Sequence, residues 1–136
     1  MNSELQVRNP GPGAGHVLFV DDTKEYEFVL HWMKKSGMQI PPAHVHSEAR
    51  NYEDAKCCLK DFHWDILLLD HDLGGEKTGY DLLKWLQSAY PKITIPRKIY
   101  LISNNTVGVR NMMALLRDFK SAKVIDEYAA LSMMSL

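Results

Sequence analysis

The sequence predicts one α/β domain, in which a doubly wound parallel sheet of five strands carries helices on both faces. Three observations predict this fold class. Short apolar runs alternate with segments whose apolar residues have helical spacing. The runs at 17–20 and 66–69 are continuously apolar, as strands covered on both faces must be. The chain of 136 residues is long enough for one buried core and too short for two ordinary domains.

The chain divides into a leader, residues 1–15, and the domain, residues 16–136. Residues 9–15 combine prolines and glycines and contain nothing to bury, so a flexible leader is expected. Order should begin at His16, just before the first strand.

The first half of the domain contains two strand and helix pairs. The strand at 17–20 precedes a helix that Asp22 or Thr23 should cap and that should end near Gly37. A weaker strand at 43–47 precedes a helix from about Asn51. The apolar positions of the two helices are Tyr26, Val29, Leu30 and Met33, then Ala55, Cys58, Leu59 and Phe62.

The second half repeats the alternation. The strand at 66–69 is followed by a polar loop and by a helix that Thr78 can cap and that ends before Pro91. A fourth strand at 98–102 precedes a helix marked by Val109, Met112, Met113 and Leu116. Residues 123–125 are predicted as a short fifth strand, and the last helix, in residues 127–136, is predicted to be short or absent.

Composition excludes some function classes. The formal net charge of -1 predicts no bulk attraction to nucleic acid or anionic membrane. No apolar run approaches the roughly 18 to 20 residues that span a bilayer, and no signal peptide pattern opens the chain. The adjacent Cys57 and Cys58 are expected to be reduced thiols. A cytoplasmic location is the expectation.

Polar residues follow three of the predicted strands. Because the carboxyl ends of parallel strands meet at one edge of the sheet, these side chains should face a single crevice. They are Asp21 and Asp22 after the first strand, Asp70 and Asp72 after the third, and Ser103, Asn104 and Asn105 after the fourth.

Clustered carboxylates repel one another unless a cation neutralises them, and Mg²⁺ prefers such oxygen ligands. Asp21, Asp22 and Asp70 are therefore the candidate metal ligands, and phosphate chemistry is implied. The alternative for Asp21 and Asp22 is helix capping, and for Asp70 a simple loop position at a strand end.

Other candidates surround this cluster. His71 or Asp72 can serve in acid-base chemistry, although His71 can instead be a hydrogen-bonded structural histidine. Ser103 can donate a hydrogen bond to phosphate. Asn104 and Asn105 can bind phosphate or cap the following helix, and Arg110 can bind phosphate or be merely solvated.

The run ending in Asp21 and Asp22, the run ending in Asp70, and the pair Ile102 and Ser103 resemble the receiver domains of two-component signalling. The resemblance implies a flavodoxin-like sheet of strand order 2-1-3-4-5, and magnesium held by Asp21, Asp22 and Asp70. It also implies that Asp70 accepts a phosphoryl group that Ser103 senses. Receivers usually place a lysine and a proline at the end of strand five, which this sequence lacks.

The segments 69–74 and 102–105, with Gly108, Asn111 and Met112, are more similar to the cyclic-phosphate processing receiver domains of bacteria and phages. That resemblance implies action on the 2′,3′-cyclic phosphate ends of nucleotides or RNA, with Mg²⁺ (or Mn²⁺) as cofactor. Asp70, His71, Asp72 and Ser103 would then be catalytic, and Ser103, Asn104, Asn105 and Arg110 would bind substrate. Ile102 stands where this branch usually has a histidine.

Three functions remain open at this point. The chain is a metal-dependent cyclic phosphodiesterase, a non-catalytic module that binds or sequesters cyclic nucleotides, or a stand-alone phosphoacceptor using Asp70. The expected partners are a small phosphorylated nucleotide or an RNA end, and a partner protein or a second copy. Neither a membrane nor long duplex nucleic acid is expected.

Overall fold

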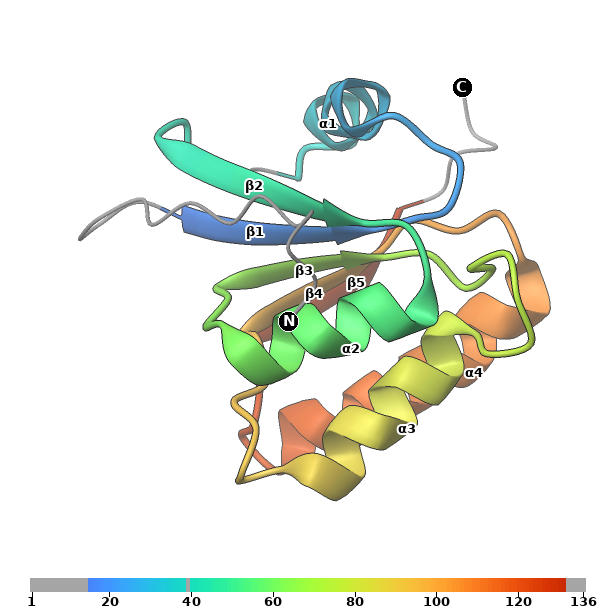
Figure 1. Cartoon of the computed structure of the whole chain (residues 1–136). Coiled ribbons are helices and arrows are strands. Elements are labelled where there is room, and N and C mark those ends of the chain that lie inside the picture. Colours follow the sequence, from blue (N-terminus) through green and yellow to red (C-terminus); the bar gives the residue numbers. More distant parts are fainter. Residues whose placement is uncertain (1–14, 39, 132–136) are drawn as a thin grey trace.

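The computed structural model describes residues 15–38 and 40–131 and shows five parallel strands in one sheet, in the order β2-β1-β3-β4-β5 (Figure 1). The predicted fold class and strand order are confirmed. The strands are β1 (Gly15–Val20), β2 (His44–Ala49), β3 (Ile66–Leu69), β4 (Lys98–Leu101) and β5 (Glu127–Ala130).

Helices cover both faces of the sheet. Helix α1 lies on one face, and the other three described helices lie together on the opposite face (Figure 1). Side chains alternate along each strand, so Leu18 and Leu67 pack toward the three helices while Phe19 and Leu68 pack toward α1. The helices are α1 (Tyr26–Lys35), α2 (Tyr52–Asp61), α3 (Gly79–Ala89) and α4 (Thr106–Ser121).

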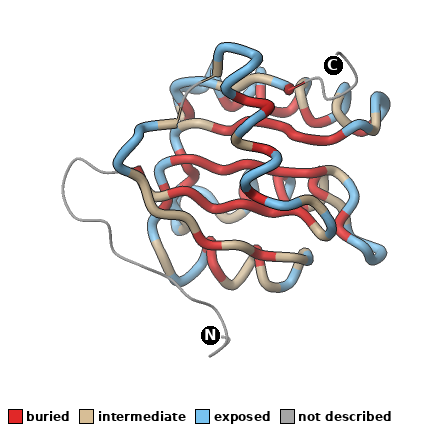
Figure 2. The backbone as a smooth tube through the Cα atoms, turned by 90° about the horizontal axis from the view of Figure 1, so that it is seen from above, coloured by how far each residue is buried: buried red, intermediate tan, exposed pale blue. Residues whose placement is uncertain are grey.

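The strand register aligns the polar loops. Val20 is paired with Leu69, and Leu69 with Leu101, so the residues that follow β1, β3 and β4 emerge side by side. The backbone N–H of Asp70 donates to the carbonyl of Val20 at 2.9 Å, which continues the sheet one step beyond β3. Figure 2 shows that the strands form the buried middle of the molecule, between the exposed loops at their ends.

The predicted cap at Thr78 is confirmed, and Asn51, where the second helix was expected to begin, also acts as a cap. Asn51 and Thr78 each accept a backbone hydrogen bond at the start of α2 and α3. The predicted cap of the first helix is wrong, because α1 begins at Tyr26 after Glu25, which makes no side-chain cap. The turn before α1 is instead organised by Asp21, which lies upstream of both expected caps.

The C-terminal elements also differ from the prediction. The fifth strand is β5 at Glu127–Ala130, not residues 123–125, and it occupies part of the expected last helix. Lys123 has a φ of 61° and lies in the turn after α4. Ile125 is buried, so the apolar pair that suggested a strand is a loop packed on the core.

The other predicted boundaries shift by a few residues. The second strand extends to Ala49 rather than ending at residue 47, and β4 ends at Leu101. The predicted leader lies outside the described residues apart from Gly15, which already belongs to β1. Within residues 15–38 and 40–131, no helix combines the length and the apolar character needed to cross a membrane.

Candidate functional site

Three carboxylates meet where β1 and β3 end. Oxygens of Asp21, Asp22 and Asp70 lie within 4.8 Å of one another. Asp21 and Asp70 are buried, with 0% and 4% of their surface exposed, while Asp22 is half-buried. The structure thus brings together the three residues that the sequence indicated as metal ligands.

Asp21 organises the loop between β1 and α1. Its Oδ1 accepts hydrogen bonds from the backbone N–H groups of Thr23 at 2.9 Å and Lys24 at 2.8 Å. The Arg50 guanidinium donates to the carbonyl oxygens of Asp21 at 3.2 Å and Lys24 at 2.6 Å. The loop is therefore fixed from both sides, and Oδ2 of Asp21 is directed to the cluster.

Lys24 enters the same cluster and was not anticipated from the sequence. Its Nζ lies 3.0 Å from Oδ2 of Asp21 and 3.5 Å from Oδ2 of Asp70. Burial lowers the pKa of Lys24, but the hydrogen bond and charge of Asp21 and the charge of Asp70 outweigh it, so that the pKa is raised. The side chain is a permanent cation between two buried carboxylates.

The carboxyl group of Asp70 ionises less readily than that of an ordinary aspartate. Burial and the neighbouring charge of Asp21 raise the pKa of its carboxyl group, while Lys24, the Ser103 hydroxyl and the N–H of His71 act in the opposite direction. The N–H of His71 donates to Oδ1 of Asp70 at 2.8 Å. A second cation near Oδ2 would favour the charged form further.

His71 points toward the start of α4 and belongs to a second polar group. Its Nδ1 lies 3.1 Å from Oδ1 of Asp72 and 3.2 Å from Nδ2 of Asn105. Asn105 also caps α4, because its Oδ1 accepts from the N–H of Gly108 at 2.9 Å. Gly108 lies against the imidazole ring, which is held between the helix and the loop.

The remaining predicted site residues differ in whether they contact the acidic cluster. Ser103 is buried, and its hydroxyl hydrogen-bonds to Asp70 and accepts the N–H of Asn105 at 3.0 Å. Asn104 and Arg110 are exposed. Within the described part of the chain Arg110 makes no ion pair, and no contact brings it to the carboxylates.

The donor set fits a hard divalent cation. The cluster offers carboxylate oxygens from two adjacent loops, and one face of it is lined by the Ser103 hydroxyl, which can orient an oxyanion. Sulfur and a set of imidazoles, which softer metals prefer, are absent from the described cluster. Phosphate next to such a cation would find hydrogen-bond donors already in place.

A parallel sheet of order 2-1-3-4-5 with acidic residues at the ends of its first and third strands defines a receiver-like domain. Solved receiver structures share this fold. The phosphorylated cyanobacterial phytochrome response regulator RcpA superimposes with a TM-score of 0.58 at 17% identity, over 90% of this chain and 84% of its own.

Two further structures give the same result. The response regulator TrrA of Thermotoga maritima, in complex with Mg²⁺ and BeF, has a TM-score of 0.53 at 19% identity, covering 88% of this chain and 89% of its own. The signal receiver domain of a histidine kinase from Syntrophus aciditrophicus has a TM-score of 0.53 at 24% identity, covering 86% and 78%. No curated protein is significantly similar to the chain.

Among proteins with the receiver fold, the chain can be assigned to one particular family. Residues 16–118 match the family described as the cyclic-phosphate processing receiver domain, and the chain belongs to it. The resemblance found in the sequence is thereby confirmed.

Proposed function

We propose that the chain is a metal-dependent phosphodiesterase that opens the 2′,3′-cyclic phosphate of a nucleotide or an RNA end. The observation that carries this proposal is the meeting of Asp21, Asp22 and Asp70 within 4.8 Å, with His71 on the same loop. Membership of the cyclic-phosphate processing family supports the choice of substrate.

Asp21, Asp22 and Asp70 would hold Mg²⁺ or Mn²⁺, which when bound polarises a phosphate oxygen and lowers the pKa of a ligated water. The chain's own groups do the rest. The Ser103 hydroxyl would orient the phosphate, and so would the Lys24 ammonium group once the metal has replaced it beside the carboxylates. Water attacks phosphorus, one ring P–O bond breaks, and a phosphomonoester with a free ribose hydroxyl results.

Two protons must move in this reaction, one from the attacking water and one to the leaving ribose oxygen. His71 is the group suited to this transfer, because an imidazole accepts and donates protons near neutral pH. Asp72 and Asn105 contact its Nδ1, which leaves Nε2 to exchange the proton. Ile102 stands where a second histidine would otherwise act, so His71 carries this role alone.

A second function is favoured by Lys24. An aspartyl phosphate on Asp70 would need a nearby cation and a hydroxyl donor. Lys24 lies 3.5 Å from Oδ2 of Asp70, and Ser103 hydrogen-bonds to the same carboxylate. The missing strand-five lysine therefore does not by itself remove a cation from the site, and a phosphoacceptor role remains the alternative.

Phosphorus NMR tests the proposal. The protein is incubated with Mg²⁺ and a nucleoside 2′,3′-cyclic phosphate, beside Asp70→Asn and beside Asp118→Asn, an exposed aspartate on α4 as matched control. The expected result is a phosphomonoester signal with the wild type and the control, and none with Asp70→Asn. An unchanged cyclic phosphate signal with the wild type would reject hydrolysis of that substrate.

The same samples separate the alternatives. Broadening of the cyclic phosphate resonance without turnover would indicate a binding module. A new acyl phosphate signal on the protein after addition of a small phosphodonor, absent in Asp70→Asn, would indicate the phosphoacceptor.

A further inference from the structure

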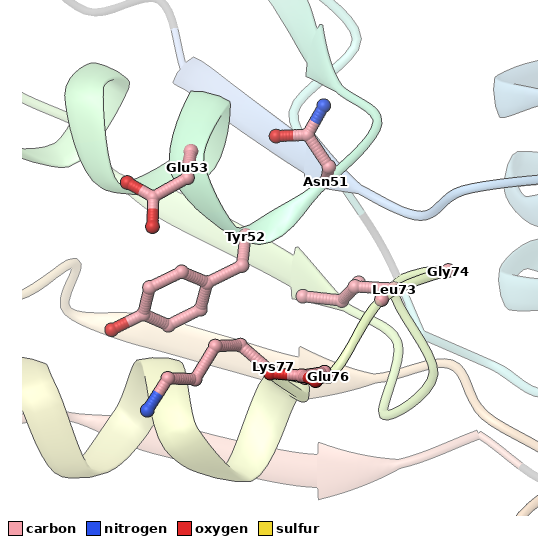
Figure 3. Close-up of a pocket in the computed structure, with 8 residues that line it drawn as sticks. Asn51, Tyr52, Glu53, Leu73, Gly74, Glu76 and Lys77 are labelled. Carbon is pink, nitrogen blue, oxygen red and sulfur yellow. The ribbon is translucent and has the colours of Figure 1, made fainter.

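A cleft of about 310 Å³ lies beside the acidic cluster, between the start of α2 and the loop from β3 to α3. Figure 3 shows the ring of Tyr52 extending from the first turn of α2 above the side chain of Lys77, with Leu73 and Gly74 on the opposite side of the view. None of the three clustered carboxylates lines it. The proposed phosphate chemistry therefore assigns no role to the residues that line this cleft.

The cleft is nevertheless next to the acidic cluster. Gly74 forms part of its wall, and a Cβ built on Gly74 would lie 3.2 Å from Oδ2 of Asp22. Gly74 has a φ of 79°, which favours glycine and lets the loop approach Asp22 closely. Gly74 thus lies between the cleft, which it lines, and Asp22, so a ligand bound in the cleft would lie close to the cluster.

The charges of the residues that line the cleft disfavour a second phosphate. Two of its residues, Glu53 and Glu76, are acidic, and only Lys77 is basic. The start of α2 is no anion site either, because Asn51 already accepts the N–H of Asp54 at 2.9 Å. The occupant should be an uncharged group, with N–H donors that the carboxylates can accept.

The cleft also has an aromatic wall. Tyr52 is half-buried against the core, and the ammonium group of Lys56 lies 5.9 Å from its ring centroid, so the ring is held in place. Leu73 is buried on the other side of the cleft. A fixed aromatic ring with an aliphatic neighbour suits a flat heterocycle, and the volume is at the small end of the range for ligand sites.

We propose that this cleft binds the nucleobase of the substrate, while its cyclic phosphate lies on the acidic cluster. The inference rests on the proposed function and adds to it that the substrate carries a base. Carboxylates at the rim favour bases with exocyclic amino groups, which donate N–H, over uracil, which lacks one. A phosphodiester without a base would occupy only the cluster.

Amide chemical shifts test this on the wild-type protein. The probes are cytidine 2′,3′-cyclic phosphate and methyl riboside 2′,3′-cyclic phosphate, which has no base, each with Mg²⁺. Both should shift the amides of Thr23 and Ser103. Only the cytidine compound should shift those of Tyr52, Glu53 and Lys77, which line the cleft away from Asp22.

If both compounds shift the cluster amides and neither shifts the cleft amides, the base site is overturned and the phosphate site stands. Cleft shifts without any cluster shift would support the base site and reject the proposed phosphate chemistry. No shift at either place would overturn both proposals.

Variants of Tyr52 provide the second measurement. Tyr52→Leu should raise the dissociation constant of the cytidine compound about tenfold, because stacking on the ring is lost, and leave that of the base-free compound unchanged. Tyr52→Phe keeps the ring and serves as the matched control, with affinity within about twofold of wild type. Equal losses for both compounds in Tyr52→Leu would overturn the base site.

Discussion

Nζ of Lys24 lies 3.5 Å from Oδ2 of Asp70, although 46 positions separate the two residues. The same ammonium group is 3.0 Å from Oδ2 of Asp21. Lys24 thus occupies the space between two buried carboxylates, which is also where a divalent cation would bind. A divalent cation held there would compete with the lysine for these oxygens, because two cations cannot share them without repulsion.

We therefore predict opposite effects of Lys24→Met with and without metal. Without metal, the variant should lose about 2 kcal/mol of stability, because two neighbouring buried carboxylates lose the cation between them. Its affinity for Mg²⁺ should rise at least about tenfold, since a positive charge is removed from the site. Denaturant unfolding and calorimetric titration measure the two quantities.

Lys35→Met is the matched control, since Lys35 is exposed in the last turn of α1. It should change neither quantity. Weaker Mg²⁺ binding by Lys24→Met would contradict the competition and would indicate that the lysine helps to assemble the metal site.

A second prediction concerns the close packing of α3 on the loop that carries Asp70. A Cβ on Gly79 would overlap the carbonyl oxygen of Asp70 and lie 3.1 Å from its carbonyl carbon. The N–H of Gly79 also donates to the carbonyl of His71 at 2.7 Å. Since backbone cannot give way as a side chain can, Gly79→Ala should cost at least about 3 kcal/mol.

Gly75→Ala is the control, because nothing lies within 4 Å of a Cβ at that position. Its stability should stay within about 0.5 kcal/mol of wild type. Thermal unfolding measures the stability of both variants against that of the wild type. A well-folded Gly79→Ala protein would show that the loop carrying Asp70 can move to make room for the added Cβ.

The sequence predicted the strands that are buried on both faces, because such strands must be continuously apolar. β1 and β3 are of this kind. β5 has exposed residues at both ends and only half-buried ones between, so its four residues lack the continuous apolar pattern that predicts a buried strand. Val124 and Ile125 were predicted as strand residues because both are apolar. A loop that packs on a helix needs apolar side chains as much as a strand does, so the sequence pattern does not distinguish the two.

The carboxylates of the site were predictable because topology alone brings the ends of β1 and β3 together. Lys24 was not, since a lysine three residues after Asp21 looks like an exposed residue before a helix. Its position depends on the fold of the loop, which Arg50 fixes from the end of β2. That contact between distant segments leaves no signal in the local sequence.

A third prediction gives the pH dependence of the cap of α3. The N–H of Thr78 donates to Oδ2 of Asp81 at 2.8 Å, and the N–H of Asp81 donates to Oγ1 of Thr78 at 3.3 Å. The hydrogen bond from Thr78 lowers the pKa of Asp81. A lowered pKa in the folded state means that the stabilisation is present above the unfolded value near 4 and is lost as the pH falls through the folded value.

Asp81→Ala should thus cost about 0.5 to 1 kcal/mol at pH 7, and clearly less at pH 2 to 3. Asp118→Ala, at an exposed position of α4, should show no such difference between the two pH values. Urea unfolding at several pH values measures both. An equal cost of Asp81→Ala at all pH values would show that the charge of Asp81 contributes nothing to the cap.

The last prediction concerns the support of His71. A Cβ on Gly108 would overlap Cγ and Cδ2 of His71 and lie 2.7 Å from its Nε2. Alanine is otherwise favoured over glycine inside a helix by about 1 kcal/mol, so Gly108→Ala would stabilise α4 if the imidazole were absent. With the imidazole present, the ring must leave its place between Asn105 and the helix, and stability should fall by about 1 to 2 kcal/mol.

The sign should reverse in the His71→Ala background, where Gly108→Ala should gain up to about 1 kcal/mol. Such a double-mutant cycle isolates the contact between the two residues from the effect of either substitution alone. In the wild-type background the displaced imidazole should also lower cyclic phosphate turnover about as far as His71→Ala does. If Gly108→Ala keeps full turnover, then the position of His71 beside α4 has no part in the proton transfer.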